Sequence, residues 1–243
     1  MSERRLDPRR LKLLYTTDLL DSPPEEAFDR LTRLATKILR TPVSLVSLVD
    51  ADRQFFKSSV GLSEPWSTER ETPLSHSFCQ YVVERDAPLV VEDAREHELL
   101  RDNLAVPDLG VVAYAGMPLR LSTGEVLGSL CAIDSQPREW TAEELEALRD
   151  LATAVVTEIE LRLALAEIAA ATHENVRRAL EVNDEVVQAL TTAKLALELD
   201  RREDAVPSVV AALAAARRFS AGMLDAAAVL EPGALRRLGD ATA

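Results

Sequence analysis

The sequence predicts an α+β fold, in which an antiparallel sheet flanked by helices is followed by a long helical hairpin that forms a dimeric bundle. Two observations lead to this prediction. Of the 8 Gly and 12 Pro residues, 5 and 10 precede Arg138, and residues 138–206 contain neither type over 69 residues. Before Arg138, short apolar segments are separated by turns, which is typical of strands. The later stretch repeats apolar residues at heptad spacing, which is typical of packed helices.

The first two expected elements are helices. Asp7-Pro8 can begin a short helix that runs through Leu14, because Pro is well tolerated in a first helical turn. Ser22-Pro23-Pro24-Glu25 gives the same signal for a second helix. The apolar face of this second helix would consist of Phe28, Leu31, Leu34, Ala35, Ile38 and Leu39.

The next segments predict a sheet. Residues 42–50 alternate Val and Ser, and Ala51-Asp52 would join them to residues 53–60 as a hairpin. Ser122-Thr123-Gly124 would join a second hairpin. The remaining expected segments are a polar loop at 61–73, a helix at 74–84, and strands at 89–91, 112–121 and 125–134. Because most of these five strands connect through hairpins or short helices, one antiparallel sheet with helices on its faces is expected.

One long helix is expected to begin at the capping box Thr141-Ala-Glu-Glu144. Its apolar stripe keeps heptad phase at Leu145, Leu148, Ala152, Val155, Ile159, Ala166, Ala169, Val176, Leu180, Val187, Leu190 and Leu197. Arg162, His173, Asn183 and Lys194 fall on the same stripe. A seam of this length requires a partner helix. A charged break at 200–207 and a second helix at 207–225 predict an antiparallel hairpin, and two hairpins would form a four-helix bundle.

Residues from about Leu20 to Arg162 resemble a GAF sensor domain of the bacterial signalling type. The matching stretches are LDSPPE at 20–25, PVSLVSLVDADRQFFKSSVGL at 42–62, TPLSHSFCQYVV at 72–83, PLVVEDAR at 88–95, YAGMPLR at 114–120, GEVLGSLCAIDSQPREWTAEE at 124–144, and the exit helix LRDLATAVVTEIELR at 148–162. This resemblance implies a six-stranded antiparallel sheet, a cavity between the sheet and its covering loops, and helices that often dimerise.

A second resemblance lies in the helical half. The segment from Glu181 to Leu190 is similar to the dimerisation helix of one class of sensor histidine kinases, and residues 230–239 look like the end of the second helix of that class. Asn183 stands where that class has its phosphate-accepting His, and a neutral amide cannot accept a phosphoryl group as imidazole does. The degenerate phosphoacceptor motif would consist of Glu181, Asn183, Asp184 and Gln188. With no ATP-binding domain expected to follow, we expect no enzyme activity, and Asn183 would fix helix register instead.

The candidate ligand cavity of the GAF-like half would be apolar, with few polar groups. Its expected lining is Phe56, Trp66, Ser77, Phe78, Cys79, Tyr114 and Met117. A free Cys is commonly a small buried apolar residue, and a thiol redox sensor made of Cys79 and Cys131 is the alternative. Gln80 follows Cys79 where bilin-binding relatives have a His, which argues against covalent bilin attachment. The sequence identifies no cofactor and no specific ligand.

Two alternative functions stay open. His173-Glu174 resembles the His-Glu pair of another kinase class, so the chain could be a phosphotransfer protein that uses His173. GAF domains also precede small RNA-binding helical modules, which would make the chain an antiterminator. The net charge, 28 − 41 = −13, argues against nucleic-acid binding. His76, His97 and the scattered acidic residues show no metal-ligand spacing.

Five regions are expected along the chain. They are an N-terminal helical segment at 1–19, a GAF sensor domain at 20–140, a connecting signalling helix at 141–172, a helical-hairpin dimerisation and docking module at 173–230, and a tail at 231–243. The expected function is non-catalytic signal transduction, in which the sensor is coupled to a homodimeric module that docks a response regulator or a histidine kinase. Two cysteines form no disulfide framework, and no apolar run reaches the ~18 residues of a membrane span, so a cytoplasmic location is expected.

Overall fold

The structure is a computed structural model, and it describes residues 4–229. It divides into two compact units, one ending at Leu165 and the other beginning at Ala166. The elements of the first unit are α1 (Pro8–Thr16), α2 (Glu26–Leu39), β1 (Val43–Val49), β2 (Arg53–Val60), α3 (Trp66–Glu69), β3 (Glu71–Pro73), the 3₁₀ turn η1 (Leu74–His76), α4 (Cys79–Arg85), β4 (Leu89–Val91), α5 (Ala105–Leu109), β5 (Ala113–Arg120) and β6 (Val126–Asp134). Helix α6 (Ala142–Glu198) begins in this unit, and α7 (Arg202–Val229) follows it.

The strands form one six-stranded sheet in the order β3-β2-β1-β6-β5-β4, and every neighbouring pair is antiparallel. This confirms the predicted fold class. The central pair, β1 and β6, can approach closely at Gly128, because a Cβ atom there would lie 1.9 Å from the carbonyl oxygen of Ser47. Glycine is therefore required at this point of the sheet.

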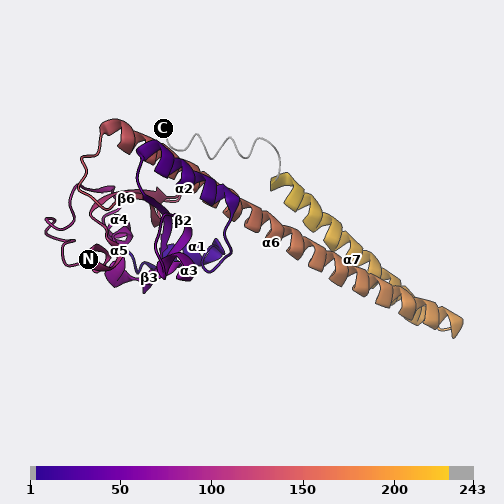
Figure 1. Ribbon diagram of the computed structural model, residues 1–243. Coiled ribbons are helices and arrows are strands. Elements are labelled where there is room, and N and C mark those ends of the chain that lie inside the picture. Colours follow the sequence, from indigo (N-terminus) through magenta and orange to yellow (C-terminus); the bar gives the residue numbers. More distant parts are fainter. Residues whose placement is uncertain (1–3, 230–243) are drawn as a thin grey trace. The chain divides into compact units, whose positions relative to one another are not determined.

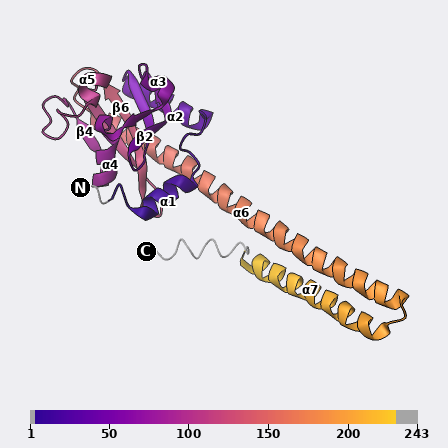
Figure 2. The ribbon, with the colours of Figure 1, turned by 90° about the horizontal axis from the view of Figure 1, so that it is seen from below.

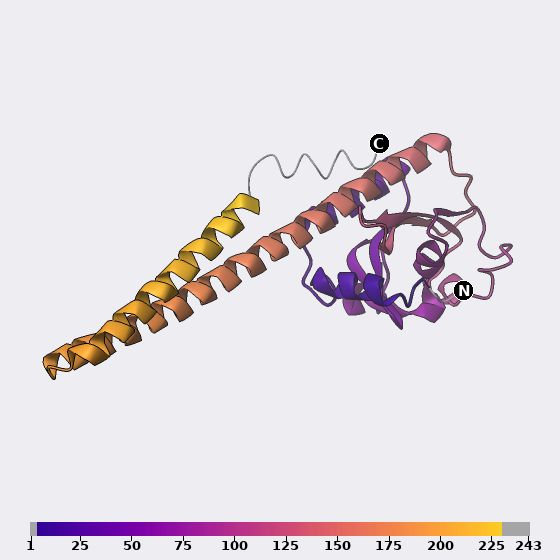
Figure 3. The ribbon, with the colours of Figure 1, turned by 180° about the vertical axis from the view of Figure 1, so that it is seen from behind.

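The two faces of the sheet carry separate apolar cores. On one face of the sheet lie α2 and the first turns of α6 (Figures 1 and 3). They pack against inward side chains such as Val46, Leu119 and Leu130. The stripe residues of α6 that take part in this core are Leu148, Ala152, Val155 and Ile159. The other face is covered by α4 and α5. The sheet is thus buried on both sides, which explains the nearly continuous burial of β1 and β6.

Helix α6 begins at the predicted capping box. The backbone N–H of Glu144 donates to Thr141 Oγ1 at 3.2 Å, and Glu144 Oε2 accepts from the Thr141 N–H at 2.9 Å. The indole N–H of Trp140 donates to the Val91 carbonyl at 3.0 Å, which fixes the chain just before the helix to strand β4. These contacts set the starting point of α6 against the sheet.

Two predicted helices differ from those in the structure. The second helix begins at Glu26 rather than Ser22, because the polar groups of residues 21–25 bind side chains of β2 and of the loop after it. The helix expected at 74–84 is two elements, separated by Ser77 in an extended conformation. Ser77 leaves the helical path because its hydroxyl donates to Gln54 and its carbonyl accepts from Asn103. On α2, Leu34 and Ile38 are exposed rather than part of the apolar face.

The segment expected to be a polar loop, 61–73, contains the short helix α3 and the sixth strand, β3. Strand β3 pairs with β2 over residues 71–73 only and ends at Pro73. A three-residue edge strand that contains Pro gives no periodic signal in a sequence, so this strand escapes prediction from the residues alone.

In the second unit, α7 runs antiparallel beside the later part of α6, as predicted (Figure 2). The break between the helices is shorter than predicted, because α7 already begins at Arg202 and includes Pro207. Small residues form their contact, namely Ala193, Ala196 and Ala205. Within residues 4–229, no helix is both long and apolar enough to cross a bilayer. The predicted tail at 231–243 and the motif at 230–239 lie outside the described residues.

Candidate functional site

The predicted cavity-lining residues gather mostly on the α4 face of the sheet. Phe56, Phe78, Cys79 and Tyr114 pack against one another in this core, and the Phe78 and Tyr114 rings meet edge to face at 5.4 Å. Trp66 lies at its margin and stacks on His76 at 5.3 Å between ring centroids. Met117 belongs to the core on the opposite face. These side chains therefore fill the α4 face as packed core, with Met117 apart from the rest.

Both cysteines lie within this core and face each other across it. Cys79 is the first residue of α4 and Cys131 lies in β6, and their sulfur atoms are 4.0 Å apart. The Tyr114 hydroxyl lies 3.3 Å from Cys79 Sγ and 3.4 Å from Ser129 Oγ. All four side chains are buried. A polar cluster of two thiols and two hydroxyls thus occupies the apolar α4 face; we call these four residues the thiol cluster.

The two thiols have opposite electrostatic surroundings. The hydrogen bond that Cys79 shares with Cys131 is the largest cause of a lowered pKa at Cys79, and hydrogen bonds with Tyr114, Ser47 and Ser129 add to it against the opposing effect of burial. Burial raises the pKa of Cys131 well above its ordinary value. Because a thiolate is the reactive form of cysteine, these opposite pKa shifts favour Cys79 as the nucleophilic member of the pair.

A buried amide fixes the start of α4 above the sheet. Gln54 Oε1 accepts hydrogen bonds from Ser77 at 2.7 Å and from Ser47 at 3.2 Å, and its Nε2 donates to Thr72 at 2.7 Å. A second bond from Nε2 reaches the His76 carbonyl at 3.3 Å. With donors and acceptors satisfied, Gln54 holds the segment that leads into Cys79 in one position.

Gly116 is a site residue that the sequence analysis missed. A Cβ atom at this position would lie 2.3 Å from the Tyr114 hydroxyl and 2.7 Å from two ring atoms. The missing side chain therefore lets the Tyr114 ring fold back along β5 so that its hydroxyl reaches Cys79. Only the short spacing between Tyr114 and Gly116 on one strand could have signalled this, because alternate residues of a strand share a face.

A second polar cluster joins residues 22–25 to the sheet and to α6. Lys57 of β2 is fully buried, and its ammonium donates to Ser22 Oγ at 2.6 Å, the Pro23 carbonyl at 2.8 Å and Glu25 Oε1 at 2.5 Å. Arg162 of α6 donates to both carboxylate oxygens of Glu25 at 2.7 Å. Burial raises the pKa of Glu25, but the bonds from Lys57 and Arg162 outweigh it and hold that pKa below the ordinary value. We call Glu25, Lys57 and Arg162 the charge link.

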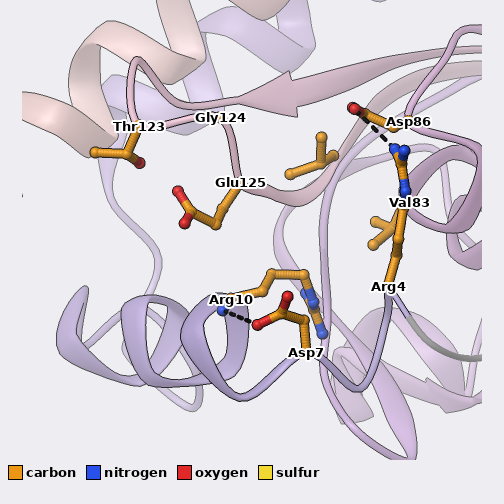
Figure 4. A pocket seen from close by; sticks show the side chains of 9 residues that line it. Arg4, Asp7, Arg10, Val83, Asp86, Thr123, Gly124 and Glu125 are labelled. Carbon is orange, nitrogen blue, oxygen red and sulfur yellow. Dashed lines mark hydrogen bonds and ion pairs between the residues drawn. The ribbon is translucent and has the colours of Figure 1, made fainter.

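A cavity of about 350 Å³ lies between α1, the end of α4 and the β5–β6 turn (Figure 4). Acidic and basic side chains line it together, and Arg4 pairs with Asp86 at 3.0 Å. Glu125 Oε2 is buried and has no hydrogen-bond partner among the described residues. This polar cavity differs from the apolar cavity expected from the sequence, and none of the predicted site residues lines it.

The degenerate phosphoacceptor motif lies on the second unit's part of α6. Its four residues, Glu181, Asn183, Asp184 and Gln188, are all exposed, and so is His173. Glu181 makes a surface ion pair with Arg177 at 3.5 Å. Over the part of the chain that the structure describes, His, Cys, Asp and Glu form no cluster of three or more that could hold a metal.

Comparison with known proteins finds a family model and a curated relative that match this chain. The family model described as "GAF domain" matches residues 23–159. A cyclic di-GMP phosphodiesterase of Pseudomonas aeruginosa is 38% identical over 126 residues, which cover 51% of this chain and 21% of that protein. The chain therefore spans about a fifth of the length of this relative.

Solved structures also match. A domain of a two-component sensor histidine kinase from Sinorhizobium meliloti is 20% identical, with a TM-score of 0.48, and the match covers 59% of this chain and 96% of that domain. The blue-light-absorbing PixJ GAF domain of Thermosynechococcus elongatus is 19% identical at a TM-score of 0.48, covering 69% and 98% of the two chains. Since the family model spans more than half of the 243 residues, this chain belongs to the GAF domain family.

Proposed function

We propose that this protein is a non-catalytic cytoplasmic signal-transduction protein, in which a GAF sensor unit controls the packing of a homodimeric helical module. One observation carries the proposal. The heptad stripe of α6 packs on the sensor's own sheet at Leu148, Val155 and Ile159, and it continues past Leu165 as apolar residues that no part of the described chain covers.

The exposure of the later stripe is large. Val176, Leu180, Val187 and Leu190 expose 54%, 60%, 54% and 48% of their surface. Helix α7 does not cover them, because it contacts α6 through the alanines Ala193 and Ala196. Contiguous apolar surface of this kind marks an interaction site in a soluble protein.

The occupant that we propose for this stripe is the same stripe of a second copy. Apolar residues at alternating spacings of three and four fit a parallel or antiparallel partner with the same pattern. A helix of 57 residues also gains most of its stability from packing of an apolar face rather than from intrinsic propensity. A self-complementary seam meets both requirements.

The charge link is the proposed route by which the sensor acts on α6. Arg162 lies on the same stripe, three residues after Ile159, and it binds the carboxylate that also neutralises the buried Lys57 of the sheet. A change in β2 or in residues 22–25 therefore alters the ionic partner of α6 directly. We propose that this alteration switches α6 between two packing arrangements, which is a common means of transmitting a signal.

The finer proposal concerns partners. Glu181, Asp184 and Gln188 are exposed beside the stripe position Asn183, which lacks a nucleophile, so this flanking surface is suited to docking a response regulator or a histidine kinase without receiving phosphate. Pull-downs with wild type and Asp184→Lys test this surface. Equal capture of the partner by both would refute the docking proposal.

Sedimentation equilibrium of the full chain tests the dimer. Leu180→Glu and Val187→Glu place charges on the exposed stripe and should convert a dimer to a monomer at micromolar concentration. Ala171→Glu is the matched control, because Ala171 is exposed on the opposite side of α6 and should leave the dimer intact. A wild-type monomer, or a dimer that survives both stripe substitutions, would refute the proposal.

A further inference from the structure

We propose that Cys79 and Cys131 form a reversible intrachain disulfide when hydrogen peroxide reaches the α4 face, so that the thiol cluster is a redox-sensitive modification site. The formation of this disulfide is independent of the signalling role. Its use as the input signal rests on the proposed function.

The geometry brings one thiol pair together from distant parts of the chain. Cys79 and Cys131 are the two cysteines of the sequence, 52 positions apart, and their sulfur atoms are separated by 4.0 Å with no residue between them. A disulfide requires an S–S distance of ~2.05 Å. Closing the gap thus needs a displacement of about 2 Å, which a short helix on the surface of a sheet can supply.

The surroundings assign different roles to the two sulfur atoms. Cys79 Sγ lies 3.3 Å from the Tyr114 hydroxyl and within reach of Cys131, both of which can donate to a thiolate. Those donors lower the pKa of Cys79, while burial raises the pKa of Cys131. This asymmetry is the one needed for an attacking and a resolving cysteine.

The reaction balances with one peroxide. The Cys79 thiolate attacks one oxygen of hydrogen peroxide, the O–O bond breaks, and the departing hydroxide takes up the proton released by Cys79 to leave as water. Cys79 is now a sulfenic acid. The sulfur of Cys131 then attacks Cys79, the S–O bond breaks, and the hydroxide leaves with the Cys131 proton as a second water. Two thiols are oxidised by two electrons, and the peroxide is reduced to two waters.

The burial of both sulfurs restricts the oxidant and protects the product. Cys79 and Cys131 are 2% and 0% exposed. An oxidant can therefore reach them only if it is about as small as water, or when α4 transiently detaches from the sheet. Helix α4 has seven residues and is joined to η1 by the extended Ser77, so it is a small element to displace. Cys131 also lies close enough to trap the sulfenic acid before further oxidation.

The disulfide would tie α4 to the centre of the sheet. Cys131 pairs with Leu45 of β1 and Gly116 of β5. Displacement of Cys131 on disulfide formation would therefore also displace the middle of both neighbouring strands. Since the opposite face of β6 supports α6 through residues such as Leu130, a shift of the sheet at this point reaches the exit helix.

The test is oxidation of the full-length protein. The native chain is treated with a small excess of hydrogen peroxide, quenched, denatured and alkylated, and the intact mass and tryptic peptides are measured. The expected product is a chain with no alkylated cysteine and a peptide pair joined through Cys79 and Cys131, reversed by dithiothreitol. Two alkylated thiols after peroxide, or cysteines that join two chains, would overturn the proposal.

Variants test the roles of the two sulfurs. Cys131→Ser should accumulate a sulfenic acid at Cys79 that reacts with dimedone, whereas Cys79→Ser should leave Cys131 unmodified. Tyr114→Phe, made with both cysteines present, removes one hydrogen-bond donor to Cys79 and should slow disulfide formation a few-fold at pH 7, because the pKa of Cys79 rises and its thiolate fraction falls. If dimedone instead labels Cys131 in the Cys79→Ser variant, the roles assigned to the two sulfurs are wrong and the proposal is overturned. If a serine variant does not fold, the peptide map of the wild type still decides whether the bond forms.

The experiment distinguishes refutation of the redox site from refutation of the proposed signalling function. Sedimentation and helix content of the reduced and oxidised proteins are compared in the same samples. A disulfide that forms without any change in the dimer confirms the redox site and refutes its use as a signal. An unchanged pair of thiols in a protein that is dimeric through α6 refutes the redox site and leaves the proposed function standing.

Discussion

The buried side chain of Lys57 holds the turn before α2 against the sheet. Its side chain is fully buried in β2, yet it carries an ammonium group, and burial lowers its pKa. A buried charge is tolerated only when partners replace its lost hydration. Ser22, Pro23 and Glu25 supply those partners, and so the turn before α2 is held to the sheet by an ionic contact.

The first prediction concerns Glu25, the counter-charge of Lys57. Glu25→Gln leaves Lys57 buried without an anion and should lower the free energy of unfolding by about 2 kcal/mol, a value reduced because Glu25 itself is partly exposed. Glu26→Gln is the matched control. Glu26 is the adjacent carboxylate and pairs with the exposed Arg33, so its substitution should have little effect. Urea unfolding measures both, and equal effects would contradict the role of the buried lysine.

The second prediction concerns acid. The pKa values of Asp21 and Glu25 are lowered, the first by its hydrogen bond from Arg53 and the second because the bonds from Lys57 and Arg162 outweigh burial. Carboxyl groups with a lowered folded-state pKa stabilise the fold above their unfolded pKa and lose this contribution as pH falls through the folded value. The melting temperature should therefore decline below about pH 4. Glu25→Gln should show a smaller decline, and parallel curves for the two proteins would contradict the assignment.

At the scale of elements, α6 is one helix with two kinds of environment. Its early stripe residues are buried against the sheet, whereas later stripe residues such as Val176, Leu180 and Val187 are exposed. Its start is fixed by the capping box and by Trp140. The early turns of α6 are therefore an integral part of the hydrophobic core of the sensor unit.

The third prediction compares the same substitution at two positions of this helix. Ile159 is 0% exposed and Ile168 is 62% exposed. Ile159→Ala should lower the unfolding free energy of the sensor unit by about 3 kcal/mol, as expected for a large core residue. Ile168→Ala should change it by less than about 0.5 kcal/mol. Denaturant titration followed by tryptophan fluorescence distinguishes them, and a similar loss at both positions would contradict the observed packing.

Elements with strong periodicity were predictable, and elements made by tertiary contacts were not. The alternation in residues 42–50 and the hairpin to 53–60 place β1 and β2 to within one residue, and Thr141-Ala-Glu-Glu144 places the start of α6. Strand β3, helix α3 and the interruption at Ser77 depend on pairing with β2 and on Gln54, which lie far away in the sequence. The short distance between Cys79 and Cys131 also depends on tertiary contacts, because the two residues are 52 positions apart in the sequence. It could not be predicted for the same reason.

At the scale of the whole molecule, the boundary between the two units bears on how the protein can be divided. The expected sensor domain ended at residue 140, whereas the compact unit ends at Leu165. A fragment cut at 138 would remove Leu148, Ala152, Val155 and Ile159 from the core beneath α2. The heptad stripe gives no signal for this boundary, because it has the same pattern on both sides of it, whereas the GAF resemblance, which extends to about Arg162, comes close to it.

The fourth prediction follows from that boundary. Residues 1–165 should form a folded monomer, while residues 1–138 should be unfolded or aggregated, since the shorter fragment exposes the apolar face that α6 covers. The full chain should sediment as a dimer. Circular dichroism and sedimentation of the three proteins measure this. A well-folded 1–138 fragment would show that α6 contributes little to the sensor core.

The uninterrupted phase of the α6 stripe also has a consequence for protein engineering and for module exchange. Each residue of an α-helix rotates the chain by ~100°, so seven residues return the stripe to nearly the same side. Removing residues 167–173 should therefore preserve both dimer formation and any control by the sensor. Removing residues 167–171 turns the later stripe by ~140° relative to the earlier one and should abolish both. If sensor units of this kind are joined to foreign output modules at α6, functional fusions should recur at intervals of seven residues, with silent ones between them.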